Sequence, residues 1–182
     1  MRIGVFIGSF DPVHKGHIEI MNYLVNKKIV DEVLVIPTGN YWDKQNLTKL
    51  SKRIAMLELI SNDKIIIDKV RNNYEYTYQI LDSLEEANRH NKYYLIMGSD
   101  NFEKLHLWKK YPDILKREII VIKRNDQKIV PENNQIIFVD QNFCQISSTL
   151  IRKKIKEGKY QDIGSFLDQN VLEYIMKQKL YR

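Results

Sequence analysis

Short apolar segments alternate with longer amphipathic segments along nearly the whole chain. A short apolar segment is typical of a buried strand, and the candidates are Arg2–Ile7, Glu32–Ile36, Lys64–Ile67, Tyr93–Met97, Glu118–Ile122 and Gln135–Val139. Apolar residues spaced three and four apart are typical of a helix, and those candidates are Gly16–Lys27, Lys49–Ser61, Thr77–Arg89, Trp108–Leu115, Ser147–Glu157 and Asp168–Gln178.

This alternation predicts an α/β fold with a mainly parallel, doubly wound sheet and helices on both faces, as in Rossmann-like proteins. No repeat, low-complexity tract or composition shift marks a linker, so we expect residues 1–182 to form a single domain. Ligands of such sheets bind at the carboxyl ends of the strands. The loops that matter therefore follow Ile7, Ile36, Ile67 and Met97, or precede the helix at Ser147.

The composition is that of an ordinary globular protein, with 43% hydrophobic and 29% charged residues. No apolar stretch approaches the roughly 18 residues that span a membrane, and the first residues lack a signal-peptide layout. One cysteine, Cys144, fits a reducing cytoplasm and excludes both an internal disulfide framework and a multi-cysteine zinc site. The net charge of +6 suits capture of polyanions, but its lysines and arginines are scattered, which disfavours nucleic-acid binding.

The segment Gly8-Ser9-Phe10-Asp11-Pro12-Val13-His14-Lys15-Gly16-His17 joins the first predicted strand to the first predicted helix. Free N–H groups and the helix dipole make such a junction an anion site. Two imidazoles three residues apart, on His14 and His17, can donate hydrogen bonds to one phosphate group. The histidine pair alone is weak evidence, but the whole constellation predicts a phosphate site.

A second candidate site is Ile146-Ser147-Ser148-Thr149-Leu150-Ile151-Arg152. Three hydroxyl residues at a helix start are natural caps. Together with the guanidinium of Arg152 one turn later, the hydroxyls and uncommitted N–H groups can also converge on a phosphate chain.

A third set of residues lies after the fourth predicted strand and in the preceding helix. Gly98 permits close approach of the backbone, and Asp100 can accept hydrogen bonds from a ribose or cap the segment Asn101–Leu105. Trp108 can stack on a flat heterocycle or belong to the core. Thr77 is a good helix cap by itself.

These segments together resemble one enzyme family. Residues 8–17 resemble the signature of the nucleotidyltransferase superfamily, whose (T/H)-x-G-H element handles the phosphates of ATP or CTP, and His14 fits its adenylyltransferase branches. Ile146 to Arg152 is similar to I-S-S-T-x-I-R of bacterial nicotinate mononucleotide adenylyltransferases. The family patterns G-A-D-x7-W, Y-T-x-x-T-L, H-R-x-x-M-L and Y-I-x4-L-Y have counterparts at Gly98–Trp108, Tyr76–Leu81, Lys52–Leu57 and Tyr174–Tyr181.

The resemblance implies transfer of AMP from ATP to nicotinate mononucleotide, giving deamido-NAD and pyrophosphate. It implies His14 and His17 as catalytic residues, and for ATP and its phosphates Gly8, Ser9, Phe10, Lys44, Ile146, Ser147, Ser148, Thr149 and Arg152. The backbone of residues 8–10 would also surround the acceptor nucleotide. For the mononucleotide it implies Thr77, Gly98, Asp100, Trp108 and Lys109. Mg²⁺ would enter with ATP, held through phosphate oxygens and water rather than by a protein metal site.

One segment departs from the family, which usually has P-x-x-P-H-K after the second strand. Here the chain has Pro37-Thr38-Gly39-Asn40-Tyr41-Trp42-Asp43-Lys44, so Lys44 is kept, the histidine is absent and Trp42 is an extra aromatic residue. The sequence leaves open the choice between nicotinate and nicotinamide mononucleotide, and the oligomeric state, a homo-oligomer included. The alternatives are a phosphopantetheine adenylyltransferase, a nucleic-acid-binding protein and an inactive nucleotide-sensing module.

Overall fold

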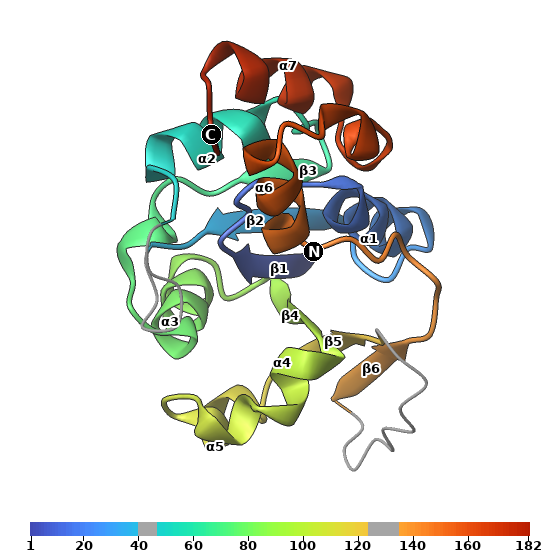
Figure 1. Cartoon of the computed structure of the whole chain (residues 1–182). Helices are drawn as coiled ribbons and strands as arrows, with labels where there is room; N and C mark the ends of the chain where they lie inside the picture. The colour runs from blue at the N-terminus through green and yellow to red at the C-terminus, as the bar shows by residue number, and fades with distance from the viewer. Residues whose placement is uncertain (40–46, 124–134) are drawn as a thin grey trace.

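The computed structural model describes residues 1–39, 47–123 and 135–182, and the statements below concern these residues. Its strands form one parallel sheet in the order β3-β2-β1-β4-β5-β6 (Figure 1). The strands are β1 (Arg2–Gly8), β2 (Glu32–Pro37), β3 (Ile65–Ile67), β4 (Lys92–Gly98), β5 (Glu118–Ile122) and β6 (Ile136–Val139). The predicted α/β doubly wound fold is confirmed, and each predicted strand matches to within one residue at either end.

Helices cover both faces of the sheet because alternate strand residues point to opposite sides. Phe6 and Ile96 belong to one core cluster with α1 (Lys15–Asn26), α2 (Leu50–Glu58), α6 (Ser148–Lys156) and α7 (Gln169–Lys177). Val5 and Leu95 belong to the other, with α3 (Thr77–Ala87) and α5 (Tyr111–Ile114). Figure 1 shows α6 and α7 on one side of the sheet and α3 and α5 on the other. A short helix, α4 (Ser99–Glu103), follows β4 directly.

One predicted helix is wrong. The segment Trp108–Leu115 begins in extended conformation at Trp108, where a 3₁₀ turn ends, and α5 starts only at Tyr111. The reason is Pro112, which lacks the N–H that a helix interior needs and fits only the first turn. Lys110 adopts a left-handed conformation with φ of 54° immediately before this turn.

Candidate active site

The residues of the first predicted site lie where the strand order of the sheet reverses. From β1 the chain moves to β2 and β3 on one side, whereas β4, β5 and β6 lie on the other. The register that pairs Phe6 with Ile96 brings the carboxyl ends Gly8 and Gly98 to the same level. Open α/β sheets bind their ligands in the crevice at this position.

The loop from Ser9 to His14, called here the phosphate loop, is fixed by a buried polar cluster. Arg53 on α2 is only 1% exposed and donates from Nη1 to the carbonyl oxygens of Ser9 and Thr38, both at 2.7 Å. Its Nε donates to the carbonyl of Thr48 at 2.9 Å. One guanidinium thus joins the loops after β1 and β2 to the start of α2.

Asp11 is the second member of this cluster and is also 1% exposed. Its carboxylate accepts hydrogen bonds from the backbone N–H of Thr48 at 3.1 Å and from the Tyr181 hydroxyl at 2.6 Å. Burial lowers the pKa of Arg53, and the charge of Asp11 opposes this effect. The two opposite charges therefore stabilise each other inside the protein.

The two predicted catalytic histidines lie against each other at the start of α1. Their rings stack with centroids 3.7 Å apart, and His14 is the more deeply buried, at 5% exposure. The backbone N–H of His14 donates to Nδ1 of His17 at 3.3 Å. An imidazole nitrogen that accepts a hydrogen bond carries no proton, so in neutral His17 the proton is on Nε2, which is a donor.

Phe10 holds the His17 ring from another side. Its ring centroid lies 5.0 Å from that of His17 and 5.4 Å from that of Phe6, both edge-on. Phe10 reaches this position with φ of 47°, an unusual conformation for a bulky residue. Gly8 leaves room for it, because a Cβ there would lie 3.2 Å from the Phe10 ring.

Backbone carbonyls at the end of β1 already have partners within the protein. The Gly8 carbonyl accepts from the N–H of Thr38 at 2.9 Å, and the Ser9 carbonyl accepts from Arg53. Phe10 is 2% exposed and its side chain belongs to the core. A ligand role for Gly8, Ser9 and Phe10 through their backbone stays a prediction.

The amino end of α6 is bonded to the phosphate loop. Ser147 is the helix cap and accepts from the N–H of Leu150 at 3.1 Å. Ser148 donates to the carbonyl of Pro12 at 2.9 Å. Arg152 donates to the carbonyl of Asp11 at 2.7 Å and to the hydroxyl of Thr149 at 3.3 Å. The three hydroxyls thus have different contacts rather than one shared target, and each of these contacts is within the protein.

The starts of α1 and α6 lie close together because Gly16 has no side chain. A Cβ on Gly16 would lie 2.5 Å from the carbonyl oxygen of Cys144, in the segment that leads into α6. The Cys144 N–H donates to the carboxylate of Glu19 on α1 at 2.7 Å. Two helix amino ends, each with N–H groups that lack helical partners, therefore flank the same loop. Such an arrangement favours binding of a polyanion.

Gly16→Ala is expected to lower the free energy of unfolding by about 1–3 kcal/mol, the usual cost of overpacking. Alanine favours a helix over glycine by about 1 kcal/mol, but a backbone carbonyl at 2.5 Å cannot yield without moving the segment before α6. Urea unfolding monitored by circular dichroism measures the change. Gly164→Ala is the control, since a Cβ there meets no atom within 4 Å. Equal stability of the two variants would contradict the prediction.

The predicted mononucleotide residues come from three segments around the second core cluster. Thr77 begins α3 and is 8% exposed, and Gly98 ends β4. Asp100 and Lys109 are exposed, while Trp108 is partly buried and packs against the second cluster. The structure therefore gives Trp108 both a core contact and a partly exposed ring. Ile146 is likewise partly buried, against the first cluster.

Two expected helix caps are wrong. The cap of α3 is Tyr76 rather than Thr77, and its N–H donates to the Gln79 side chain at 3.0 Å, which fixes the helix start one residue earlier. The cap of the helix after β4 is Gly98 rather than Asp100, because α4 continues directly from the strand and already includes Ser99. Asp100 lies in the first turn of α4, where a negative charge is favourable.

Lys44 and Trp42 lie outside the described residues. Within the described part of the chain, no group of three or more histidine, cysteine, aspartate or glutamate side chains is placed to hold a metal ion. No helix of these same segments is long and apolar enough to cross a membrane.

Residues 5–154 match the model of the cytidylyltransferase-like family. The chain belongs to that family. It is 33% identical to a protein of Enterococcus faecalis named probable nicotinate-nucleotide adenylyltransferase, over 100% of this chain and 85% of that protein. It is 30% identical to a protein of the same name from Lactococcus lactis, over 100% of this chain and 95% of the other.

A solved structure supports the same grouping. Plasmodium falciparum nicotinic acid mononucleotide adenylyltransferase complexed with NaAD superposes with a TM-score of 0.84 at 25% identity. The alignment covers 99% of this chain and 97% of that one. The family resemblance inferred from the motifs is confirmed, and it extends over the whole length of the chain.

Three residues of the polar cluster have no assigned role among the predicted site residues. Asp11, Arg53 and Tyr181 each lie inside a family-like segment, namely G-S-F-D-P, K-R-I-A-M-L and Y-I-x4-L-Y. That placement is the only sequence signal for them. Their convergence depends on the packing of distant segments, since Arg53 lies 42 residues and Tyr181 lies 170 residues beyond Asp11 in the chain.

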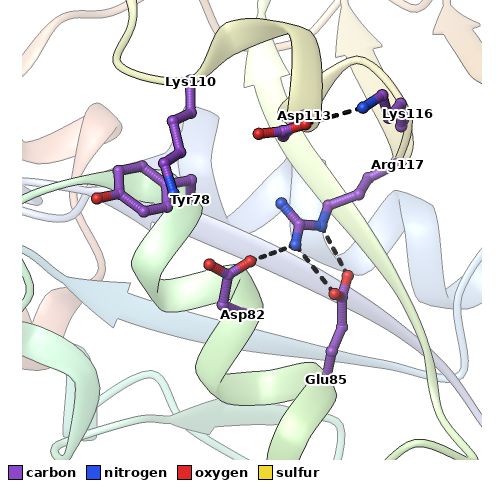
Figure 2. Close-up of a pocket in the computed structure, with 7 residues that line it drawn as sticks. All are labelled: Tyr78, Asp82, Glu85, Lys110, Asp113, Lys116 and Arg117. Atoms are coloured by element: carbon purple, nitrogen blue, oxygen red, sulfur yellow. Dashed lines mark hydrogen bonds and ion pairs between the residues drawn. The ribbon is translucent and has the colours of Figure 1, made fainter.

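A separate pocket of about 430 Å³ lies between α3 and the segment around α5 (Figure 2). Arg117 lies in this pocket and donates to the Glu85 carboxylate from Nε at 2.8 Å and from Nη2 at 3.0 Å. Its Nη2 also donates to the carboxylate of Asp82. Burial lowers the pKa of Arg117, and these hydrogen bonds more than offset that effect. The full lining is Tyr78, Asp82, Glu85, Lys110, Asp113, Lys116 and Arg117, with three cations and three carboxylates. None of the predicted site residues lines this pocket, and its balanced charge does not suit a polyphosphate.

Proposed function

We infer that this chain is a nicotinate-nucleotide adenylyltransferase, which transfers AMP from ATP to nicotinate mononucleotide. The supporting observation is the phosphate loop between two helix amino ends at the position where the strand order reverses. The full-length relatives of the same name support the substrate class. The alternatives of a phosphopantetheine enzyme and a nucleic-acid-binding protein have no comparable support.

The reaction needs no protein nucleophile. A phosphate oxygen of the mononucleotide attacks the α-phosphorus of ATP and forms the new P–O bond. The bond from that phosphorus to the bridging oxygen of the β-phosphate breaks, and its electron pair leaves with pyrophosphate. Catalysis then consists of positioning the two phosphates in line and stabilising the charge that develops on them.

We propose that His17 is the principal donor to the transferred phosphoryl group, with Nε2–H as the donating group. The N–H groups at the start of α6, together with Arg152 and Lys44, would hold the β and γ phosphates. His14 is more deeply buried, so we propose that it contributes a phosphate contact and also supports the His17 ring by stacking.

Mg²⁺ is proposed to enter as part of the MgATP substrate. Asp11, the carboxylate within the phosphate loop, accepts from Thr48 and Tyr181 and is 1% exposed, so it is poorly suited to bind an exposed cation. A metal held by ATP oxygens and water fits these observations. We further propose a single catalytic domain spanning residues 1–182, located in the cytoplasm.

Release of pyrophosphate tests the proposed function. The purified protein is incubated with MgATP and one acceptor, which is nicotinate mononucleotide, nicotinamide mononucleotide or phosphopantetheine. We expect the highest kcat/KM with nicotinate mononucleotide. The proposal would be contradicted if phosphopantetheine were the only acceptor that gave turnover, or if none of the three acceptors gave any.

Trp108→Ala is expected to raise the KM for the mononucleotide by up to roughly ten-fold and to change the KM for ATP less. Stacking on one ring contributes about 0.5–1.5 kcal/mol beyond area burial, so the effect is moderate. Steady-state kinetics with each substrate varied in turn measure both constants. Trp42→Ala is the comparison. If that variant raised the KM for the mononucleotide more than Trp108→Ala does, the pyridine ring would be assigned to the loop after β2.

A further inference from the structure

We propose that Tyr181, the penultimate residue of the chain, is a positioning residue for adenylyl transfer that acts through Asp11 on the phosphate loop. The inference rests on the proposed function. It adds a residue at the far end of the chain to the machinery that holds His14 and His17.

The contact between these two residues is short and partly buried. The Tyr181 hydroxyl donates to Oδ1 of Asp11 at 2.6 Å, across 170 residues of sequence. Asp11 is 1% exposed, and its other oxygen accepts from the backbone of Thr48. A buried carboxylate needs its donors, because each lost hydrogen bond leaves charge that water cannot reach.

The phenol is a reliable donor. Burial raises the pKa of Tyr181 above its ordinary value, and the charge of Asp11 and the hydrogen bond to it raise it further. An ordinary tyrosine is already protonated at neutral pH, so Tyr181 donates this hydrogen bond under the assay conditions.

Asp11 transmits the contact to the site because its backbone is also held. Its carbonyl accepts from Arg152, and the carbonyl of Pro12 accepts from Ser148. Three residues beyond Asp11, His14 occupies the N-cap position of α1 and donates its N–H to His17. A shift of the Asp11 side chain would therefore move the backbone of the phosphate loop, which positions both histidines and is bonded to the start of α6.

A turn after α7 brings Tyr181 back toward the phosphate loop. After α7, the N–H of Leu180 donates to the carbonyl of Ile175, and that of Lys179 donates to the carbonyl of Met176. This pair of bonds is a Schellman motif, in which the reversing position is usually glycine. Here Lys179 has φ of 51°, and Tyr181 has φ of 64°.

Neither residue is glycine, and the left-handed conformation is unfavourable for an L-residue because it brings Cβ too close to the following carbonyl oxygen. Strain of this kind persists where surrounding contacts hold it in place. Leu180 and Tyr181 both pack against the first core cluster, and the hydroxyl of Tyr181 adds the bond to Asp11. The packing accounts for the position of the ring, whereas the hydroxyl contacts Asp11 of the phosphate loop and also the side chain of Thr48.

Tyr181→Phe tests the proposal because it removes the hydroxyl and keeps the ring. We expect kcat for pyrophosphate release to fall by roughly 10- to 100-fold, the scale of a misplaced catalytic group. The KM for MgATP should change by less than about three-fold, since most phosphate contacts are kept. Rates are taken per folded molecule, with the folded fraction measured by circular dichroism at the assay temperature.

Two controls separate positioning from general stability. Tyr160→Phe removes a hydroxyl elsewhere in the C-terminal segment, where the ring also packs on the first cluster, and should leave kcat unchanged. Lys179→Gly relieves a left-handed residue and keeps the Tyr181 hydroxyl, so it should preserve kcat. A kcat of Tyr181→Phe within two-fold of the wild type would overturn the proposal.

Action through Asp11 is tested by a double-mutant cycle. If Tyr181 acts only through that carboxylate, Asp11→Asn and Tyr181→Phe together should lower kcat no more than Asp11→Asn alone. Additive losses would overturn this route. The wild-type protein provides a separate check of the proposed function. If it showed no turnover with any acceptor, the proposed adenylyltransferase activity would be refuted, but the positioning role of Tyr181 would not.

A measurement that needs no turnover covers that case. The ring ¹⁵N and ¹H signals of His14 and His17 should shift in Tyr181→Phe and stay unchanged in Tyr160→Phe. Unshifted histidine signals in the folded Tyr181→Phe protein would overturn the positioning role irrespective of the reaction catalysed.

Discussion

His17→Ala is expected to lower kcat for pyrophosphate release by roughly two to four orders of magnitude, the scale of losing a preorganised donor to developing charge. The His17 ring is stacked on His14 at 3.7 Å and contacts Phe10 edge-on at 5.0 Å, so its orientation is set before substrate binds. Its Nδ1 accepts from the backbone, which leaves the proton on Nε2. Folding should survive, since the ring is only partly buried.

The measurement is a steady-state pyrophosphate assay with circular dichroism as the check on folding. His90→Ala is the matched control, because His90 is exposed in the turn after α3 and its removal should leave kcat unchanged. His17→Gln keeps a side-chain N–H donor and should recover part of the lost rate. A His17→Ala protein with near-normal turnover would remove this residue from the mechanism.

The strands and most helices could be predicted because each depends on local pattern. β5 matches its predicted range completely, and α6 begins at the predicted hydroxyl cluster with Ser147 as its cap. The error at Trp108–Leu115 has a local cause as well. Apolar spacing favoured a helix, but Pro112 restricts the start to Tyr111, and this constraint overrides periodicity.

The candidate site could be predicted only in part. The strand–loop–helix motif identified the phosphate loop, because the chemistry and the sequence neighbourhood coincide there. No local pattern reveals that the three hydroxyls after Ile146 have separate partners, or that Gly16 is needed for the close approach of Cys144. The bond from Tyr181 to Asp11 is of the same kind. Such contacts depend on how distant elements pack, so the structure is needed to find them.

Arg53→Met is expected to lower the free energy of unfolding by about 3–5 kcal/mol, the cost of breaking a buried charge network from one side. The side chain is 1% exposed and donates to the carbonyls of Ser9, Thr38 and Thr48. Methionine fills similar volume but leaves all three acceptors without this donor. It also removes the cation beside the buried carboxylate of Asp11. The charge of that carboxylate raises the pKa of Arg53, which shows that the two groups interact.

Urea unfolding measures this change, and Lys49→Met is the matched control. Lys49 is an exposed cation at the start of the same helix, so its loss should stay within about 0.5 kcal/mol. Arg53→Lys should give an intermediate loss, because an ammonium restores the charge beside Asp11 but cannot reproduce the planar fork that reaches three carbonyls. A loss below about 1 kcal/mol in Arg53→Met, judged against the usual cost of one hydrogen bond, would show that the loops after β1 and β2 are held by other contacts. The phosphate loop would then owe its position mainly to α6 and Tyr181.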